Sequence, residues 1–267
     1  MANKTIVITG ASGGIGAGIA RRLGREGHKL VLAARRPAEL DAVAADVKAA
    51  GASATLVVPT DVTRRADIDA LAAAAIEKFG GFDVWINNAG RGITKSVLDL
   101  NDEDIDEMIA INVKSALYGM QAATAHFLER GSGQIINVSS FLGRVPMALP
   151  RSAYNAAKAA LNSLTANARV ELHARNPNVH VTLVMPGMVA TEFALNARNA
   201  PADAAIYTGA HVQSVEDVAE VVAGVIADPV AEVYTNPASA GMARKYFEDV
   251  GAFELQAGTP WSPPGNR

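Results

Sequence analysis

The chain has 267 residues and a hydrophobic fraction of 49%, which fits a globular protein with a substantial buried core. Its formal net charge is only −3, so the composition favours neither a nucleic acid nor an anionic membrane surface as a partner. The absence of cysteine excludes disulfides and thiolate chemistry, and the first residues show no signal-peptide pattern, so we expect a cytoplasmic protein.

The histidines and the apolar segments argue against two further classes of protein. The five histidines are scattered without the spacing of metal ligands, so we expect no metal site. No apolar run approaches the length that spans a bilayer, so we expect no membrane partner.

A glycine-rich turn follows the first apolar run of the chain. Residues 5–8 fit a short buried strand and residues 17–25 a helix. The segment between them, Thr9 to Gly16, contains four glycines. A strand, such a turn and a helix together direct backbone N–H groups and the positive end of a helix dipole at one point, which suits a phosphate. A glycine-rich turn alone could equally be a plain loop, so this prediction depends on further motifs.

The rest of the chain alternates between strand and helix patterns. The expected strands cover residues 29–34, 53–59, 82–87, 134–139, 179–184 and 232–235. The expected helices cover residues 37–50, 64–79, 101–130, 152–175 and 214–227. Continuous apolar strands that alternate with helices predict an α/β fold, a single-domain doubly wound parallel sheet (Rossmann fold) of about seven strands with helices on both faces.

We expect residues 1–250 to form this one domain. The irregular segment 191–212 follows the sixth strand at the ligand edge of the sheet, and we interpret it as a lid over the substrate rather than a plain surface loop. Residues 251–267 form a proline-rich C-terminal tail, whose last residues we expect to be frayed or to lie across a neighbouring subunit.

Three residues near the fifth strand point to proton-transfer chemistry. Tyr154 and Lys158 lie four residues apart in an expected helix, so their side chains share one face. Ser140 leaves the fifth strand at the edge of the sheet where ligands bind. A lysine ammonium at ~4 Å would lower the pKa of a phenol from about 10 by roughly three units, into the working range of a proton donor and acceptor. Each residue alone could also be a packing residue or a cap.

Six motifs in chain order resemble those of the short-chain dehydrogenase/reductase family. They are Thr9-Gly10-x-x-x-Gly14-x-Gly16, Asn87-Asn88-Ala89-Gly90, Asn112, Ser140, Tyr154-x-x-x-Lys158 and Pro186-Gly187-x-x-x-Thr191. The resemblance implies that Tyr154 is the general acid or base and that Ser140 orients a substrate carbonyl. It also implies that Lys158 holds the nicotinamide ribose and tunes Tyr154, and that Asn112 positions water in a proton relay.

The position of the serine departs from the family pattern. Ser140 precedes Tyr154 by fourteen residues, whereas the family's serine more often lies thirteen residues before the tyrosine, at the place that Phe141 holds here. A loop longer by one residue explains the difference. Ser139, one step earlier, points to the opposite side of the strand and stays an alternative.

The end of the second strand bears on the choice of cofactor. Ala34 stands where a carboxylate would bind the ribose hydroxyls of NAD(H), and Arg35 and Arg36 follow it. We therefore predict NADP(H), with NAD(H) as the alternative if both arginines only solvate the strand end. Asp61 resembles the family position that binds the adenine amino group. The expected cofactor contacts are Gly10, Ser12, Gly13, Gly14, Ile15, Gly16, Arg35, Arg36, Asp61, Val62, Asn88, Ala89, Gly90, Tyr154, Lys158, Pro186, Gly187 and Thr191.

The expected substrate pocket is mostly apolar and adjoins the motif residues. Its expected lining is Arg91, Phe141, Arg144, Met147, Met188, Val189 and Phe193. Such a wall suits a ketone, an aldehyde or a secondary alcohol. Arg91 or Arg144 could hold a carboxylate or phosphate, although a loop arginine is more often solvent-facing.

We predict an NADP(H)-dependent carbonyl reductase or alcohol dehydrogenase that acts on a small molecule. The alternatives are NAD(H) dependence, a nucleotide-binding regulatory protein of the same fold without redox chemistry, and isomerisation or imine reduction with the same dinucleotide. Family resemblance also implies pairing through the helices at 101–130 and 152–175, so we expect a homodimer or homotetramer.

Overall fold

The computed structural model describes residues 3–209 and 211–257. Its centre is a seven-stranded sheet in the order β3-β2-β1-β4-β5-β6-β7, and every neighbouring pair is parallel. The strands are β1 (Thr5–Thr9), β2 (Lys29–Ala34), β3 (Ala54–Pro59), β4 (Val84–Asn87), β5 (Gly133–Val138), β6 (Val179–Met185) and β7 (Glu232–Tyr234). This arrangement confirms the predicted single α/β domain with a doubly wound parallel sheet.

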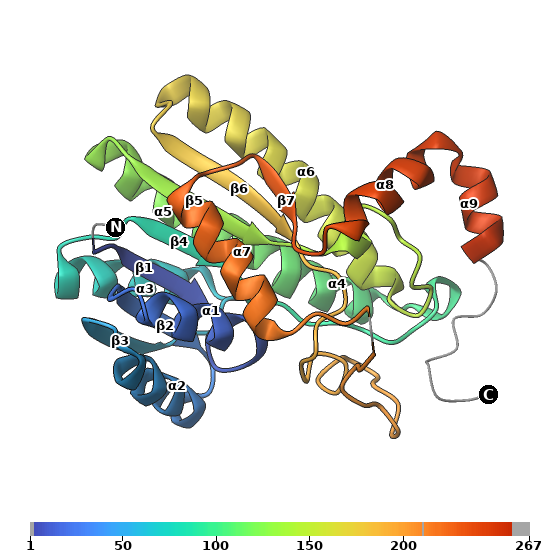
Figure 1. Cartoon of the computed structure of the whole chain (residues 1–267), viewed down its shortest axis with the longest axis horizontal. Helices are drawn as coiled ribbons and strands as arrows, with labels where there is room; N and C mark the ends of the chain where they lie inside the picture. Colours follow the sequence, from blue (N-terminus) through green and yellow to red (C-terminus); the bar gives the residue numbers. More distant parts are fainter. Residues whose placement is uncertain (1–2, 210, 258–267) are drawn as a thin grey trace.

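Helices cover both faces of the sheet (Figure 1). The helices are α1 (Gly14–Gly24), α2 (Pro37–Ala50), α3 (Arg65–Phe79), α4 (Asp102–Ile109), α5 (Ser115–Arg130), α6 (Ser152–Arg175), α7 (Val215–Ala227), α8 (Ala238–Glu248) and α9 (Val250–Ala257). Shorter turns of 3-10 helix, η1 (Val97–Asp99) and η3 (Phe141–Gly143), and of π-helix, η2 (Ala110–Lys114), connect some of them. No helix among the described residues combines the length and the apolar character needed to cross a membrane.

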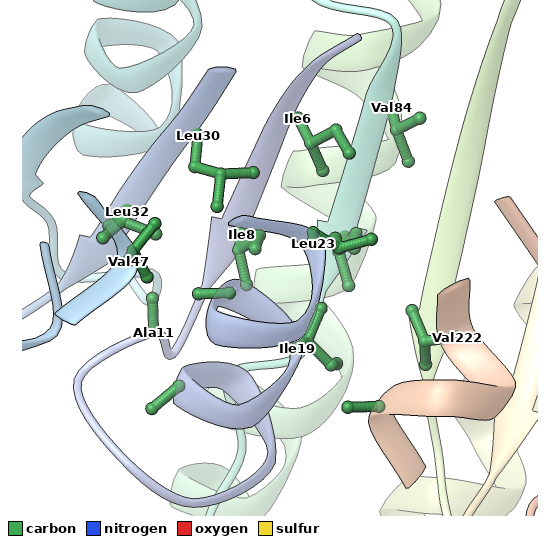
Figure 2. Close-up of a cluster of buried hydrophobic side chains, with 14 of the residues drawn as sticks. Ile6, Ile8, Ala11, Ile19, Leu23, Leu30, Leu32, Val47, Val84 and Val222 are labelled. Atoms are coloured by element: carbon green, nitrogen blue, oxygen red, sulfur yellow. The ribbon is translucent and has the colours of Figure 1, made fainter. Parts of the chain in front are cut away.

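Successive side chains of the central strands point to opposite faces of the sheet and form a hydrophobic core on each face. Ile6 and Ile8 of β1 point to the face covered by α1, α2 and α7, where Leu23 and Val222 meet them (Figure 2). Val7 points to the opposite face, toward α3, α5 and α6. Both faces of β1 are therefore buried, which explains its continuously apolar sequence. Burial of each Ile or Leu side chain contributes about 2 kcal/mol to the stability of the fold.

Parallel pairing brings the carboxyl ends of all the strands to one edge. The order of the strands reverses between β1 and β4, which leave the sheet side by side. Asn88, just after β4, donates its Nδ2–H to the carbonyl of Thr9 at 3.0 Å, at the end of β1. This switch point is where open α/β sheets bind ligands.

The structure differs from the prediction in two places. The helix expected over 101–130 is broken into α4 and α5 by the π-helix η2. Helices α8 and α9 were not predicted, and the tail expected over 251–267 begins within α9; its remaining part, 258–267, lies outside the described residues. Helix α8 begins after Pro237, and Ala243 on its inner face packs against Phe141. The segment 191–212 contains no helix or strand in its described part, as predicted.

Candidate active site

Tyr154 and Lys158 lie on the first turns of α6, and both side chains are buried. The ammonium nitrogen of Lys158 donates a hydrogen bond to the carbonyl of Val138 at 2.9 Å, at the end of β5. That nitrogen lies 5.7 Å from the centre of the Tyr154 ring. The predicted shared face of the helix is therefore present, and it is anchored to the carboxyl edge of the sheet.

Ser140 is the serine that faces Tyr154. Its hydroxyl lowers the pKa of the phenol by hydrogen bonding, in opposition to burial, and it accepts a hydrogen bond from the backbone N–H of Leu142 at 3.1 Å. The hydroxyl of Ser139 instead donates to Oδ1 of Asn162 at 2.5 Å, on the next turns of α6. The two neighbouring serines therefore have different surroundings, and the longer loop remains the explanation that we propose for the spacing of Ser140 and Tyr154.

Asn112 lies in the π-helix η2, and its side chain forms hydrogen bonds with the backbone of the segment that follows β4. Its Oδ1 accepts the N–H of Arg91 at 3.2 Å, and its Nδ2 donates to the carbonyl of Arg91 at 3.0 Å. The widened turn leaves the carbonyl of Ile111 without its usual helical partner, and the hydroxyl of Ser115 donates to it at 2.6 Å. A π turn of this kind often marks a functional position in a helix.

Gly90 lets Asn112 and Lys158 approach each other. A Cβ at this position would lie 2.8 Å from Oδ1 of Asn112 and 3.5 Å from the nitrogen of Lys158. Because Gly90 has no side chain, the segment after β4 can pack closely against both Asn112 of η2 and Lys158 of α6.

Burial dominates the titration of the two central groups. It raises the pKa of Tyr154 to about 12, against the hydrogen bond from Ser140 and the positive charge of Arg151. Burial also lowers the pKa of Lys158 to about 7. The direction for the phenol is opposite to the one expected from the sequence, because removal from water outweighs the attraction of nearby positive charge. The structure thus holds a protonated phenol at neutral pH.

The glycine-rich turn after β1 fits a bound phosphate. Gly13 is the N-cap of α1 and supplies no side-chain cap, and the first turn of the helix contains no acidic residue. Helices α4 and α7, by contrast, begin with complete capping boxes. A Cβ at Gly16 would lie 2.3 Å from the carbonyl oxygen of Gly10, so the turn can be this tight only with glycine there. The uncapped N–H groups of α1 suit the pyrophosphate of a dinucleotide.

The motifs after β4 and β6 close this cradle on two sides. The hydroxyl of Thr9 accepts hydrogen bonds from the backbone N–H groups of Asn88 and Ala89. Thr191 lies across the turn, with its methyl carbon 3.5 Å from the position of a Cβ on Gly14. Pro186, after β6, accepts the N–H of Phe141 at 2.8 Å and so fixes the residue that follows Ser140.

The two arginines after β2 diverge. A guanidinium nitrogen of Arg36 lies 3.4 Å from the hydroxyl of Ser12 in the glycine turn, and another lies 3.3 Å from the carboxylate of Glu39. Arg35 instead acts electrostatically on Asp61, which follows β3. The pKa of Asp61 is lowered there: burial opposes this shift, hydrogen bonds from Thr63 produce it, and the charges of Arg35 and Arg64 add to it. Val62, beside Asp61, is buried.

The expected substrate arginines are both paired with carboxylates. Nη1 of Arg91 lies 2.5 Å from Glu107, and Nη2 of Arg144 lies 2.7 Å from Glu232 of β7. Arg144 also lines an open hollow of about 580 Å³ beside α8, whose lining includes none of the residues Ser140, Tyr154 and Lys158. Neither guanidinium is therefore an uncompensated anchor for an acidic group.

The expected apolar lining residues separate into two groups. Phe141 and Met147 pack with Val145 and the C-terminal helices. Phe193, in contrast, lies against Tyr154. Met188 is 40% exposed, whereas Val189 is buried. Phe193 is therefore an expected lining residue whose ring contacts Tyr154 directly.

Three charged residues beside the site were not predicted from the sequence. Arg151, immediately before α6, is buried within three residues of Tyr154, a spacing that could have identified it. Arg198 binds Asp104 and Glu107 of α4, at 2.6 and 2.5 Å, and so holds the 191–212 segment against that helix. Lys95 also binds the buried carboxylate of Asp104 at 2.6 Å.

A comparison with protein families places this geometry in a known group. The family model described as short chain dehydrogenase matches residues 4–202. The chain belongs to the short-chain dehydrogenase family. The matched range contains all six motifs, so this short-chain dehydrogenase has its candidate site wholly within the part that defines the family.

Related sequences agree with the assignment. This short-chain dehydrogenase is 38% identical over 203 residues to an uncharacterized oxidoreductase of Staphylococcus aureus (strain MW2), a match that covers 76% of the chain and 84% of the relative. An uncharacterized oxidoreductase of Staphylococcus epidermidis is 37% identical over 188 residues, which cover 70% of the chain and 79% of the relative. The short-chain dehydrogenase described here is therefore an oxidoreductase of this type.

Solved structures extend the likeness to the whole fold. A short chain dehydrogenase/reductase from Burkholderia phymatum, in complex with NAD, superposes with a TM-score of 0.83 at 28% identity and covers 99% of this chain and 98% of its own. A short-chain dehydrogenase from Sphingobium yanoikuyae, in complex with NADPH, has a TM-score of 0.77 at 27% identity, with the same coverage. Known members of similar fold thus include complexes with either nucleotide.

Proposed function

We propose that this short-chain dehydrogenase transfers hydride reversibly between NADP(H) and a ketone or secondary alcohol, with Tyr154 as the general acid or base. The observation that carries the proposal is the shared burial of Ser140, Tyr154 and Lys158 at the carboxyl end of β5, where the Lys158 nitrogen lies 5.7 Å from the Tyr154 ring and donates to the carbonyl of Val138. A carbonyl oxygen placed against both hydroxyl groups would have its reacting carbon beside the glycine cradle.

The nicotinamide, when bound, supplies or accepts the hydride. In the reductive direction Tyr154 donates its proton to the carbonyl oxygen as negative charge develops there. The pKa of about 12 keeps this proton on the phenol at neutral pH, so the group is prepared for donation. Ser140 donates a hydrogen bond to the same oxygen and orients it. Lys158, in its charged form, favours the phenolate that remains, and Asn112 holds the backbone beside it.

The preference for NADP(H) rests on the end of β2. Ala34 supplies no carboxylate to bind the ribose hydroxyls or to repel a 2′-phosphate, and the Arg36 guanidinium lies against Ser12 of the glycine turn. A guanidinium at this position is suited to bind a phosphate with two parallel hydrogen bonds. The Sphingobium yanoikuyae relative in complex with NADPH supports this choice.

NAD(H) is the second candidate, and one observation favours it. Glu39 lies 3.3 Å from Arg36 and so partly neutralises the charge on which the phosphate would depend. The Burkholderia phymatum relative in complex with NAD is consistent with that alternative. Binding of each nucleotide therefore has to be compared directly.

We assign the 191–212 segment the role of a lid. It carries Thr191 to the glycine turn and Phe193 to Tyr154, and Arg198 ties it to α4. A segment fixed at these points excludes water from the phenol.

The test is NADPH and NADH oxidation against a panel of ketones, diketones, quinones and oxo acids, with Tyr154→Phe as the deciding variant. We expect this variant to lose about 10³-fold in kcat and to keep its affinity for NADPH, because only the proton donor is removed. Retained turnover in Tyr154→Phe, or no turnover of any carbonyl by the wild type, would contradict the proposal.

A further inference from the structure

Arg151 is a buried cation that the proposed chemistry does not use. Its side chain lies just before the first turn of α6, and the residue is 9% exposed. Nη1 donates to the carbonyl of Ile93 at 3.2 Å and to the hydroxyl of Thr94 at 3.1 Å. Nη2 donates to the hydroxyl of Tyr207 at 2.9 Å. All three acceptors are neutral, so no hydrogen-bond partner among the described residues compensates its charge.

The other arginines around the site do have counter-charges. Arg91, Arg144 and Arg198 each form an ion pair with a carboxylate. Every aspartate and glutamate of the chain lies within the described residues, and none forms an ion pair with Arg151. A guanidinium taken out of water without a counter-charge is costly, and such a charge in an enzyme commonly serves a ligand.

The position of Arg151 places this charge beside the reacting groups. It precedes Tyr154 by three residues at the start of one helix, and its positive charge acts on the phenol. A Cβ on Gly92 would lie 2.8 Å from the Phe193 ring and 3.1 Å from Nη1 of Arg151. The guanidinium and the ring that covers Tyr154 therefore meet at the same glycine.

The hydrogen bonds of Arg151 leave room for a carboxylate. A guanidinium has five N–H donors, and the three bonds described involve Nη1 twice and Nη2 once. None of the hydrogen bonds of Arg151 among the described residues comes from Nε, and Nη2 donates to the Tyr207 hydroxyl alone. Nε and Nη2 lie on one edge of the planar guanidinium, and this edge is the side-on fork that can bind both oxygens of a carboxylate.

We propose that Arg151 binds a carboxylate of the substrate, so that the enzyme acts on oxo acids and the corresponding hydroxy acids in preference to neutral ketones. The proposal rests on the proposed function, because the carbonyl of the same molecule must reach Ser140 and Tyr154. It deepens that function by naming the class of substrate. Arg91 and Arg144, which the sequence suggested for this task, are already compensated by Glu107 and Glu232.

The experiment compares each acid with its own methyl ester. Linear 2-, 3- and 4-oxo acids of four to eight carbons, and their methyl esters, are reduced with saturating NADPH, and kcat/KM is measured for each pair. For at least one pair we expect the wild type to prefer the acid by about 100-fold, the size expected for a buried charge pair. In Arg151→Gln we expect the ratio of acid to ester to fall about 100-fold, and Arg151→Lys should restore part of it because the charge returns without the fork.

Matched variants and the esters separate the possible failures. Arg91→Gln and Arg144→Gln remove guanidinium groups that are already paired, so the ratio should stay within about threefold of the wild type. Loss of the ratio in either of these variants instead of Arg151→Gln would overturn the proposal, as would equal losses on acid and ester in Arg151→Gln, which indicate a purely structural arginine. Reduction of neutral ketones and esters without preference for acids would refute the carboxylate site and leave the oxidoreductase function standing. Absence of turnover on every compound would instead refute the proposed function.

Discussion

The ring of Phe193 packs against the ring of Tyr154, with their centres 5.3 Å apart and their planes inclined by 59°. Phe193 belongs to the 191–212 segment, whereas Tyr154 belongs to α6. The burial that raises the pKa of the phenol is therefore supplied partly by a segment that lies outside the regular structure.

Removal of this ring should change the pH dependence of the reaction. In Phe193→Ala water reaches the phenol, so its pKa should fall from about 12 toward its ordinary value of 10.0. Reduction requires the protonated phenol, so kcat/KM for carbonyl reduction should begin its alkaline decline at a lower pH than in the wild type. Rate profiles from pH 7 to 11 measure the shift. Phe193→Leu keeps an apolar cover and should decline near the wild-type pH; equal profiles for wild type and Phe193→Ala would contradict the assigned role of the ring.

Asp104 should contribute to acid stability. The hydrogen bond from Lys95 is the largest cause that lowers its pKa to about 2, from an ordinary value of 3.8, although burial opposes the shift. A carboxyl whose pKa is lower in the folded state stabilises it fully above the unfolded pKa and loses this contribution as the pH falls through the folded pKa. The urea midpoint of Asp104→Asn should thus lie below that of the wild type at pH 7, and the gap should close between about pH 4 and 2. The exposed Asp106, on the same helix, provides the control Asp106→Asn; a gap independent of pH would contradict this account.

The tight turn after β1 should tolerate no side chain at Gly16. In Gly16→Ala the new Cβ would meet the carbonyl oxygen of Gly10 at 2.3 Å and the Asn88 amide at 2.5 Å. We expect a loss of about 3 kcal/mol in unfolding free energy, and weaker NADPH binding because the cradle must widen. Gly224→Ala, in an open position of α7, should instead gain up to about 1 kcal/mol from helix propensity. Urea unfolding of both variants decides the matter, and a neutral Gly16→Ala would refute the close-packed turn.

The choice of nucleotide should depend on the two arginines after β2. The double variant Arg35→Asp with Arg36→Ala should bind NADPH about 100-fold more weakly and NADH nearly as before, because only the former carries the 2′-phosphate. Fluorescence titration measures both dissociation constants. Arg64→Ala, an exposed arginine near Asp61, serves as the control. Equal weakening of both nucleotides in the double variant would favour the alternative that these arginines only solvate the strand end.

The strands and the site motifs could be predicted because their signals are local. Continuous apolar runs such as Thr5–Thr9 are typical of strands buried on both faces. The glycine turn and Ser140 closely follow such strands, and Tyr154 and Lys158 share one helix at a spacing of four residues. Parallel pairing then brings the carboxyl ends of the strands to the same edge of the sheet.

The parts that could not be predicted depend on contacts between distant residues. Residues 109–114 contain no glycine or proline, so no local signal in the sequence predicts the π-helix. Within this π-helix Asn112 makes hydrogen bonds with Arg91, which lies about 20 residues earlier in the chain. Arg151 looks like an ordinary loop arginine until Thr94 and Tyr207, which are about 57 residues away on either side, enclose it. The sign of the Tyr154 pKa shift likewise depends on how deeply the fold buries the phenol.

The π-helix between α4 and α5 constrains how the chain can vary in length. Its turn holds one residue more than an α-helical turn, so the inward sides of the two helices are offset by about 100° from those of one uninterrupted helix. Deletion of one residue from Ala110–Lys114 would allow that uninterrupted helix, but it would rotate either Met108 or Met120 away from the apolar layer that each one fills. The Asn112 amide and the packing of both helices therefore depend on the same additional residue, so a deletion there would disturb all of them together.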